Sequence, residues 1–184
     1  RGEVLGISAN WDLPVSQEFT QSFSLGVDHK AFDQQIETAG GMTTSPIRYY
    51  PFTANYLAGW HREGVSTDFS TSLVWHFRGL GSDGAAFNRS RFKAGGSFVY
   101  LRGDLTHTRD VKGGLQLMWK AQWQLADQPL VNSEQFTGGG VNSVRGYLEA
   151  SAVGDRGLMG TFEVRTPVLL KGVVREGDEL RMHG

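Results

Sequence analysis

Residues 111–125 read VKGGLQLMWKAQWQL and decide the fold of this chain. Apolar residues or glycine occupy every second position of the segment, whereas lysine and glutamine fill most of the positions between them. Only Met118 breaks the polar side. A period of two is typical of a β-strand, because helical spacing would group apolar residues three and four positions apart. The segment is therefore predicted to be one long strand with an apolar and a polar face.

The same alternation recurs along the chain. Four further segments carry it, at residues 19–27, 50–60, 65–77 and 92–100. They are longer than the usual strand of about 5 to 6 residues and match the roughly 9 to 11 residues with which a tilted strand crosses a bilayer. All tryptophans fall on the apolar faces, several of them near strand ends where an aromatic girdle would lie. They are Trp11, Trp60, Trp75, Trp119 and Trp123. Strand length and tryptophan placement together predict a membrane β-barrel.

The connections between these strands alternate in length. The predicted short links are residues 14–17, 63–64 and 108–110, and the predicted long links are residues 33–46, 79–90 and 126–156. Such sorting is typical of an up-and-down barrel with tight periplasmic turns and longer extracellular loops. A soluble sandwich has no reason to sort its loops by side. We therefore expect an all-β, antiparallel transmembrane barrel.

Composition excludes several other classes of protein. No run approaches the roughly 18 consecutive apolar residues of a transmembrane helix. A formal charge of −1 gives no support to a nucleic-acid partner, which would call for a basic patch. The five histidines are dispersed without metal-ligand spacing, and neither a phosphate-binding loop nor a G-x-S-x-G nucleophile motif is present. We expect no metal, no cofactor and no enzymatic activity.

A glycine-rich stretch follows the strands. Residues 136–167 read FTGGGVNSVRGYLEASAVGDRGLMGTFEVRTP, and the glycines allow this segment to fold tightly back on itself. Arg145 would place a permanent cation inside a barrel, where it needs a partner. Glu163 lies on the polar side of the alternating strand that follows, and can accept the guanidinium as a charge-assisted pair. The alternation alone fits equally well with a surface hairpin whose charges are solvated.

The sequence of this stretch resembles that of a known family. GGGVNSVRGY, then GDRG, then GTFEVRTP, is similar to the signature of the two-partner secretion transporters, the TpsB proteins of the ShlB, FhaC and HecB type. These belong to a wider superfamily that includes the BamA assembly factors. The loop motif that marks the superfamily is Val144, Arg145, Gly146 and Tyr147. Flanking residues support the motif, and several of them favour the secretion transporters: Gly139, Gly140, Ser143, Glu149, Gly154, Asp155, Arg156 and Gly157.

The resemblance implies a fold and a function. The family has a sixteen-stranded outer-membrane barrel preceded by periplasmic POTRA domains, and exports a large unfolded exoprotein of the haemolysin or adhesin type. Its sixth extracellular loop folds into the lumen, where the loop arginine pairs with acidic residues of the barrel wall. Carried over, Arg145 is the loop arginine and Glu163 the wall acid. The implied partners are a secreted exoprotein and outer-membrane lipid of a Gram-negative bacterium, with the barrel a monomer.

The expected organisation has three parts. Residues 1–126 are predicted to hold six barrel strands, residues 127–157 the inward-folded loop, and residues 158–184 the next strand and the start of another. The chain begins without methionine and stops as a strand begins, so we expect further strands and the POTRA domains to lie outside it. Two alternatives stay open at this point. One is a BamA-type assembly factor, and the other is a passive porin or a soluble β protein.

Overall fold

The structure is a computed structural model of the 184-residue chain, and it describes residues 2–38, 41–138 and 152–167. Its long strands are β1 (Gly2–Asp12), β2 (Phe19–Thr38), β3 (Gly41–Tyr49), β4 (Phe52–Arg62), β5 (Val65–His76), β6 (Phe98–Val111), β7 (Leu115–Ala126) and β10 (Gly157–Arg165). Shorter elements are helix α1 (Gly84–Ser90), the 3-10 turn η1 (Asn132–Glu134), β8 (Phe136–Gly138) and β9 (Ala152–Gly154). Among the described residues no helix is both long enough and apolar enough to cross a membrane.

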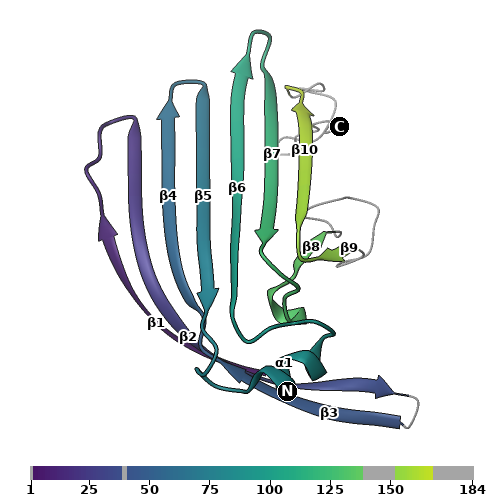
Figure 1. Ribbon diagram of the computed structural model, residues 1–184. Helices are drawn as coiled ribbons and strands as arrows, with labels where there is room; N and C mark the ends of the chain where they lie inside the picture. Colours follow the sequence, from purple (N-terminus) through teal and green to yellow (C-terminus); the bar gives the residue numbers. More distant parts are fainter. Residues whose placement is uncertain (1, 39–40, 139–151, 168–184) are drawn as a thin grey trace, which may run out of the picture.

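The long strands form one curved antiparallel sheet in the order β1-β2-β4-β5-β6-β7-β10, with β3 paired to the C-terminal part of β2. Sequence neighbours are therefore spatial neighbours, as an up-and-down topology requires. Figure 1 shows the tight connections at one end of the sheet, and α1, β3 and the β7–β10 connection at the other. We call these the turn end and the loop end. The predicted all-β antiparallel fold is confirmed.

The register gives the sheet two different faces, since directly paired residues of antiparallel strands point to the same side. The inner face carries small polar residues, with Asn55 paired between Ser24 and Ser72. The outer face is apolar and solvent-exposed, with Trp60 at 47%, Leu125 at 58% and Phe162 at 54% exposure. A contiguous exposed apolar surface of this kind fits contact with lipid.

The buried core lies at the loop end of the inner face. There α1 and the segment before η1 cover the ends of β3, β5, β6 and β7. Asp83 caps α1 by accepting a hydrogen bond from the backbone N–H of Ala86. The core residues are Ile47, Tyr49, Val74, Phe87, Ala94, Phe98, Tyr100, Ala126, Leu130 and Val131. The long connections are therefore packed on the inside of the sheet at this end.

One predicted strand boundary is wrong because of a turn. The strand expected over residues 111–125 begins only at Leu115, and Val111 is the last residue of β6 and pairs directly with it. Gly113 and Gly114 have φ values of 87° and 76°, which glycine adopts without strain, and they form the hairpin. Gly113 stands at an apolar position of the alternation, so the sequence pattern does not reveal the turn.

The strand predicted over residues 92–100 is also misplaced. β6 begins at Phe98 and runs to Val111, so the short link predicted over residues 108–110 lies inside a strand. Residues 92–97 belong to the connection after α1, where Lys93 has a φ of 64° that a regular strand does not tolerate. The polar end of β6 carries no apolar alternation that could have marked it as a strand.

The long link predicted over residues 33–46 is instead strand. β2 continues to Thr38 and β3 begins at Gly41, with Lys30 opposite Tyr49 and Thr38 opposite Gly41. In this two-stranded ribbon the backbone groups that face the partner strand are paired and those on the outer edges face solvent, so its side chains need no apolar alternation. The hairpin extends past the neighbouring strands at the loop end (Figure 1).

Candidate functional site

The predicted loop motif lies outside the described residues. This applies to Gly139, Gly140, Ser143, Val144, Arg145, Gly146 and Tyr147. The structure does describe the chain on both sides of the motif, and we call residues 130–138 together with residues 152–157 the loop stem. β8 and β9 pair within it, with Phe136 opposite Gly154 and Gly138 opposite Ala152. The two halves of the loop stem are therefore joined by a short antiparallel ladder.

Glu163 lies on the inner face of β10, directly opposite Met118 of β7. It is buried, at 8% exposure, and its carboxylate is 3.3 Å from Nη2 of Arg165. Arg165 Nη1 also donates to Oε1 of Gln116, at 3.2 Å. The wall position expected for the partner of Arg145 is thus a buried carboxylate, already in contact with one guanidinium.

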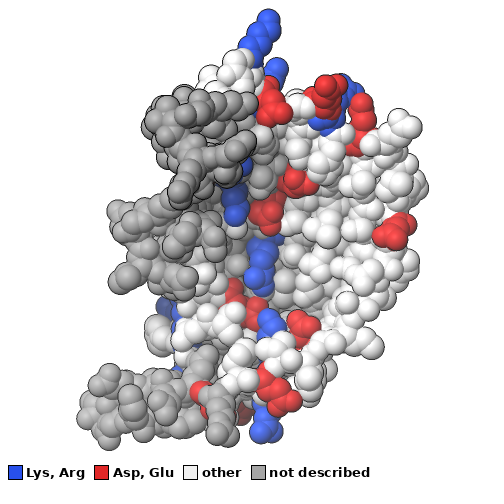
Figure 2. Space-filling view, turned by 180° about the vertical axis from the view of Figure 1, so that it is seen from behind, with Lys and Arg blue, Asp and Glu red and all other residues white. Residues whose placement is uncertain are grey.

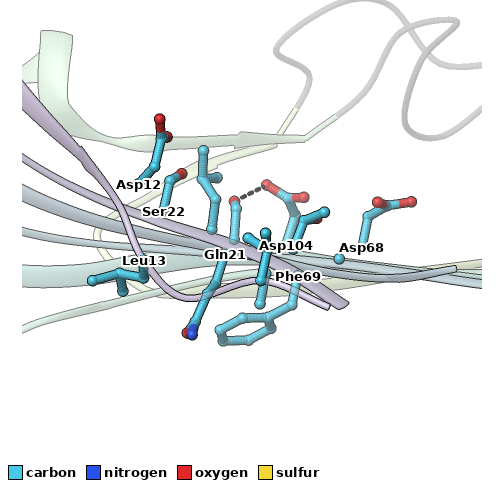
Figure 3. Close-up of a pocket in the computed structure, with 13 residues that line it drawn as sticks. Asp12, Leu13, Gln21, Ser22, Asp68, Phe69 and Asp104 are labelled. Carbon is cyan, nitrogen blue, oxygen red and sulfur yellow. Dashed lines mark hydrogen bonds between the residues drawn. The ribbon is translucent and has the colours of Figure 1, made fainter. Parts of the chain in front are cut away.

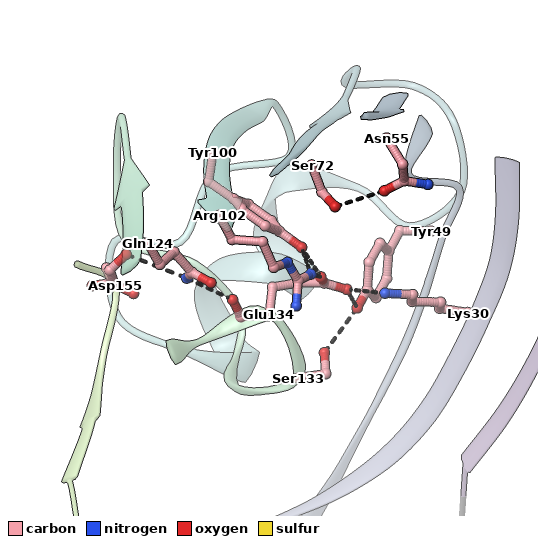
Figure 4. Close-up of polar contacts among 10 residues, drawn as sticks. All are labelled: Lys30, Tyr49, Asn55, Ser72, Tyr100, Arg102, Gln124, Ser133, Glu134 and Asp155. Carbon is pink, nitrogen blue, oxygen red and sulfur yellow. Dashed lines mark hydrogen bonds and ion pairs between the residues drawn. The ribbon is translucent and has the colours of Figure 1, made fainter. Parts of the chain in front are cut away.

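A second buried carboxylate, Glu134 of η1, holds the first half of the loop stem against the wall. Its Oε1 lies 2.6 Å from Nζ of Lys30 and accepts a hydrogen bond from the Tyr49 hydroxyl, also at 2.6 Å. Its Oε2 accepts from the Tyr100 hydroxyl at 2.5 Å and lies 3.6 Å from Nη2 of Arg102. These side chains belong to β2, β3 and β6, and they converge on Glu134 (Figure 4). We call this set, Glu134 with Lys30, Tyr49, Tyr100 and Arg102, the Glu134 cluster.

Charge and hydrogen bonding keep Glu134 ionised. Burial by itself raises the pKa of this carboxyl, because desolvation disfavours the charged form. The Lys30 ammonium and the donated hydrogen bonds from Lys30, Tyr100 and Tyr49 outweigh burial and hold the pKa of Glu134 below its ordinary value. The side chain has no solvent exposure. Glu134 is thus a desolvated anion that depends on its partners.

Gln124 of β7 reaches both halves of the loop stem. Its Nε2 donates to the backbone carbonyl of Glu134 at 2.9 Å and to that of Asp155 at 3.3 Å. Ser133 adds a contact to β3, since its Oγ lies 2.8 Å from the Tyr49 hydroxyl. A glutamine on the polar face of a strand would not by itself suggest such a role. Gln124 nevertheless fastens two backbone segments of the loop stem to β7.

Asp155 holds the second half of the loop stem. Its carboxylate forms a two-point pair with Arg91, which lies just after α1, and the Nη2–Oδ2 distance is 2.9 Å. It also accepts the backbone N–H of Leu130 at 3.0 Å, while Arg91 Nη1 donates to the Leu130 carbonyl at 2.6 Å. Burial raises the pKa of Asp155, but the hydrogen bonds from Arg91 and Leu130 outweigh burial and lower it.

The other residues of the predicted GDRG motif also lie in the loop stem. Arg156 Nε donates to the carbonyl of Ala126 at 2.8 Å. A Cβ on Gly157 would lie 2.3 Å from the ring of Phe136, so a side chain there requires Phe136 or the backbone to move. A Cβ on Gly154 would meet the backbone of Arg156, with the carbonyl oxygen at 3.3 Å and the nitrogen at 4.0 Å. These glycines and charges shape the return of the chain from the loop to β10.

The inner face has an open hollow toward the turn end. About 700 Å³ in volume, it lies beside Asp12, Ser22, Asp68 and Asp104, and Ser70 donates to Asp104 at 2.7 Å. In Figure 3 these polar side chains stand on one side of the sheet and Phe69 points to the other. Within the described part of the chain no group of three or more histidine, cysteine or acidic residues could hold a metal ion.

Charges are not spread evenly over the inner face. Arg102, Asp104, Lys120, Glu163 and Arg165 occupy its β6, β7 and β10 positions. Figure 2 shows acidic and basic side chains gathered into one column beside a broad surface with few charges. Small polar residues dominate the neighbouring strands, as the Ser24, Asn55 and Ser72 row illustrates. The loop stem lies against the charged strands at the loop end.

Sequence reasoning missed Glu134 and its partners. Glu134 sits in a segment without alternation, and Lys30 and Tyr49 precede it by 104 and 85 residues. Arg91 lies 64 residues before Asp155. Apart from Asp155, which belongs to the predicted motif, no sequence pattern marks these residues. Only the register of the sheet brings them together.

Comparison with known proteins agrees with this geometry. A search of the curated proteins finds no match. Among solved structures, CdiB from Escherichia coli is similar, with a TM-score of 0.74 and 15% sequence identity over 92% of this chain. That alignment spans 31% of the CdiB chain and shows a shared fold. The sequence model of the haemolysin secretion/activation proteins ShlB/FhaC/HecB matches residues 6–174. The chain belongs to this family of two-partner secretion proteins.

Proposed function

We propose that this chain forms part of the barrel of an outer-membrane transporter, which exports a large unfolded exoprotein of the haemolysin or adhesin type by two-partner secretion. The family match over residues 6–174 carries the proposal. The sheet supports it, because the matched residues form a wall with an apolar outside, a polar inside and a loop stem docked within. The proposed site is the bacterial outer membrane, and the proposed partner is the exoprotein.

The inner face suits passage of an extended chain. The row of Ser24, Asn55 and Ser72 is uncharged, and Asn55 donates to Ser24 at 3.0 Å and accepts from Ser72 at 2.6 Å. A surface whose polar groups are already satisfied offers a passing peptide few strong contacts. A channel must bind its cargo weakly enough to release it. We infer that the exported chain passes along these strands, and that its folding outside the cell supplies direction.

The loop would act as a lock on this path. We propose that Arg145 pairs with Glu163 inside the barrel, as the family resemblance implies. Glu163 supports this role because it is buried on the inner face, where a carboxylate requires cationic partners. Removing one member of a fully buried pair costs about 3 to 5 kcal/mol, and much less where water reaches it. The lock would hold the loop in one position between transport events.

Secretion of the cognate exoprotein tests this function. Cells carrying the full-length protein are compared with cells carrying Arg145→Ala or Glu163→Ala, at equal barrel levels in the outer membrane. Glu18→Ala is the matched control, since Glu18 also pairs with an arginine, Arg62 at 2.6 Å, but does so exposed at the turn end. We expect secretion to fall in the first two variants and to stay unchanged in the control.

Other outcomes point elsewhere. Undiminished secretion in both lock variants would reduce the arginine loop to scaffolding. Loss of assembly of unrelated outer-membrane barrels, with no effect on one exported protein, would favour an assembly factor of the BamA type. Free passage of small solutes without any exported protein would favour a porin.

A further inference from the structure

We propose that Glu134 is a positioning residue that clamps the loop stem and the β2–β3 hairpin to the inner wall, and that this clamp keeps the channel closed between transport events. The inference rests on the proposed function, because it concerns how the loop of a transporter is held. It differs from the Arg145–Glu163 lock, because Glu134 lies in the loop stem and contacts three other strands.

The contacts of Glu134 identify it as a clamp between separate elements. Lys30 belongs to β2 and Tyr49 to β3, so one carboxylate oxygen contacts both strands of the hairpin. Tyr100 belongs to β6 and contacts the other oxygen. Each tyrosine hydroxyl lies within 2.6 Å of the carboxylate, the short distance typical of hydrogen bonds to an ionised acceptor. No two of these three partners are adjacent in sequence.

A packing role alone would not need this chemistry. Apolar residues of similar volume often stabilise a buried site as well as an ion pair does, so burying Glu134 and Lys30 gives little net stability. The same site already contains an apolar cluster, with Tyr49, Phe98 and Tyr100 among its members. A charged centre within such a cluster makes its geometry selective, because displacement of the loop stem leaves a desolvated anion without donors.

The clamp acts on both halves of the loop stem. Gln124 binds the backbone carbonyls of Glu134 and Asp155, and Asp155 in turn binds Arg91 and the N–H of Leu130. Leu130 precedes Glu134 by four residues. The incoming and outgoing segments are therefore fastened to each other as well as to the wall. A shift of Glu134 away from Lys30 pulls on Asp155 through Gln124.

The docked loop stem takes up room inside the wall. Phe136 and Thr137 face Arg102 and Gln122 across a hollow of about 240 Å³ at the loop end. Together with the core under α1, the loop stem covers the inner face there. Undocking it would join this hollow to the larger one near Asp12 and Asp104, and widen the path for ions. Channel current is therefore the direct measure of the clamp.

The test is the conductance of the purified full-length protein in planar lipid bilayers. The variants are Glu134→Ala, Glu134→Gln and Lys30→Met, and the matched control is Glu18→Gln, which neutralises an exposed carboxylate paired with Arg62 at the turn end. We expect the open fraction to rise by about tenfold in Lys30→Met, the shift that loss of one charge-assisted hydrogen bond produces, and by more in Glu134→Ala, which removes the acceptor of three such bonds. Glu134→Gln should fall between these variants and wild type.

A conservative variant separates gating from folding. Tyr100→Phe removes one hydroxyl donor and keeps the ring that stacks on Phe98. It should raise the open fraction by a smaller factor while the folded share of the barrel, seen as heat-modifiable mobility on a gel, stays that of wild type. The double variant Lys30→Met with Glu134→Gln removes both charges, so its effect should be smaller than the product of the single effects.

Wild-type conductance in Glu134→Ala, Lys30→Met and Tyr100→Phe would overturn the clamp, and so would equal effects of Glu134→Gln and Glu18→Gln. The measurement needs no exoprotein. Open channels in the cluster variants, in a protein that exports nothing in cells, would support the clamp and defeat the transporter. Unchanged conductance, together with secretion that depends on Arg145 and Glu163, would overturn the clamp and support the transporter.

Discussion

Glu134 and Lys30 meet at 2.6 Å although 104 residues separate them in the sequence. The contact joins the loop that follows β7 to a strand that is not its neighbour in the sheet, because β4, β5 and β6 lie between β2 and β7. It forms inside the curve of the sheet, where the long connections of the loop end are packed together. The relationship shows that the loop of this family member is fastened to the wall at its stem.

Removing the partner of Glu134 should destabilise the barrel. Lys30→Met leaves an anion with no solvent exposure and without its ammonium, a change that typically costs about 3 to 5 kcal/mol. We expect the unfolding temperature of the heat-modifiable barrel to fall clearly. Arg62→Met, which breaks the exposed pair with Glu18, is the control and should leave it within error. Equal behaviour of the two variants would show that the Glu134 cluster contributes no more than a surface pair.

Acid should release the loop stem. The pKa values of Glu134 and Asp155 are both lowered in the folded protein, so the unfolded chain binds protons at higher pH than the folded chain does. The stabilisation is therefore complete above the ordinary carboxyl pKa of about 4, and is lost as pH falls through the lower folded values. We expect bilayer conductance to stay low from pH 7 to about 5 and to rise below about 4.

A paired variant checks this pH dependence. Glu134→Gln with Asp155→Asn removes both titrating groups, while the groups that face Glu134, namely Lys30, Arg102 and the two tyrosines, stay in place. Its conductance should be raised at neutral pH and should change little on acidification. A steep acid response that survives in this variant would assign the effect to other carboxylates of the wall.

The two faces of the sheet should differ in tolerance to charge. Phe162→Arg places a cation on the exposed apolar face, where the cost near the middle of a bilayer is about 2 to 4 kcal/mol. Gln122→Arg places the same group on the inner face, opposite Asp104. We expect the first variant to assemble poorly into outer membranes and the second to assemble normally. Similar membrane levels of both variants would contradict a lipid-facing outer surface.

The alternation of residues predicted the faces of the strands well, because burial on one side imposes a period of two on any long strand. Asn55, Trp60, Trp119 and Phe162 lie on the faces expected for them. Boundaries were predicted poorly wherever another force determined the structure. Gly113 allowed a turn that hydropathy alone does not reveal.

Some residues of the candidate site could be predicted from the sequence, and others could not. The sequence motifs predicted Asp155 and Glu163 as site residues, and the structure places them in the loop stem and on the inner face of β10, respectively. The pairing of Arg145 with Glu163 stays a prediction. Glu134 could not have been predicted, because its role depends on tyrosines and a lysine that only the register of the sheet brings within hydrogen-bonding distance.

Gly157 should be required for docking of the loop stem. A Cβ at this position would lie 2.3 Å from the Phe136 ring, so Gly157→Ala must displace either Phe136 and β8 or the start of β10. Gly160, in the same strand, is the matched control, since the nearest heavy atom to its Cβ lies at 3.9 Å. We expect secretion and channel closure to suffer in Gly157→Ala and to be normal in Gly160→Ala. Phe136→Leu, which shortens the opposing side chain, should restore both properties to Gly157→Ala. Failure of this rescue, with both alanine variants equally impaired, would place the defect in β10 itself and not in its contact with the loop stem.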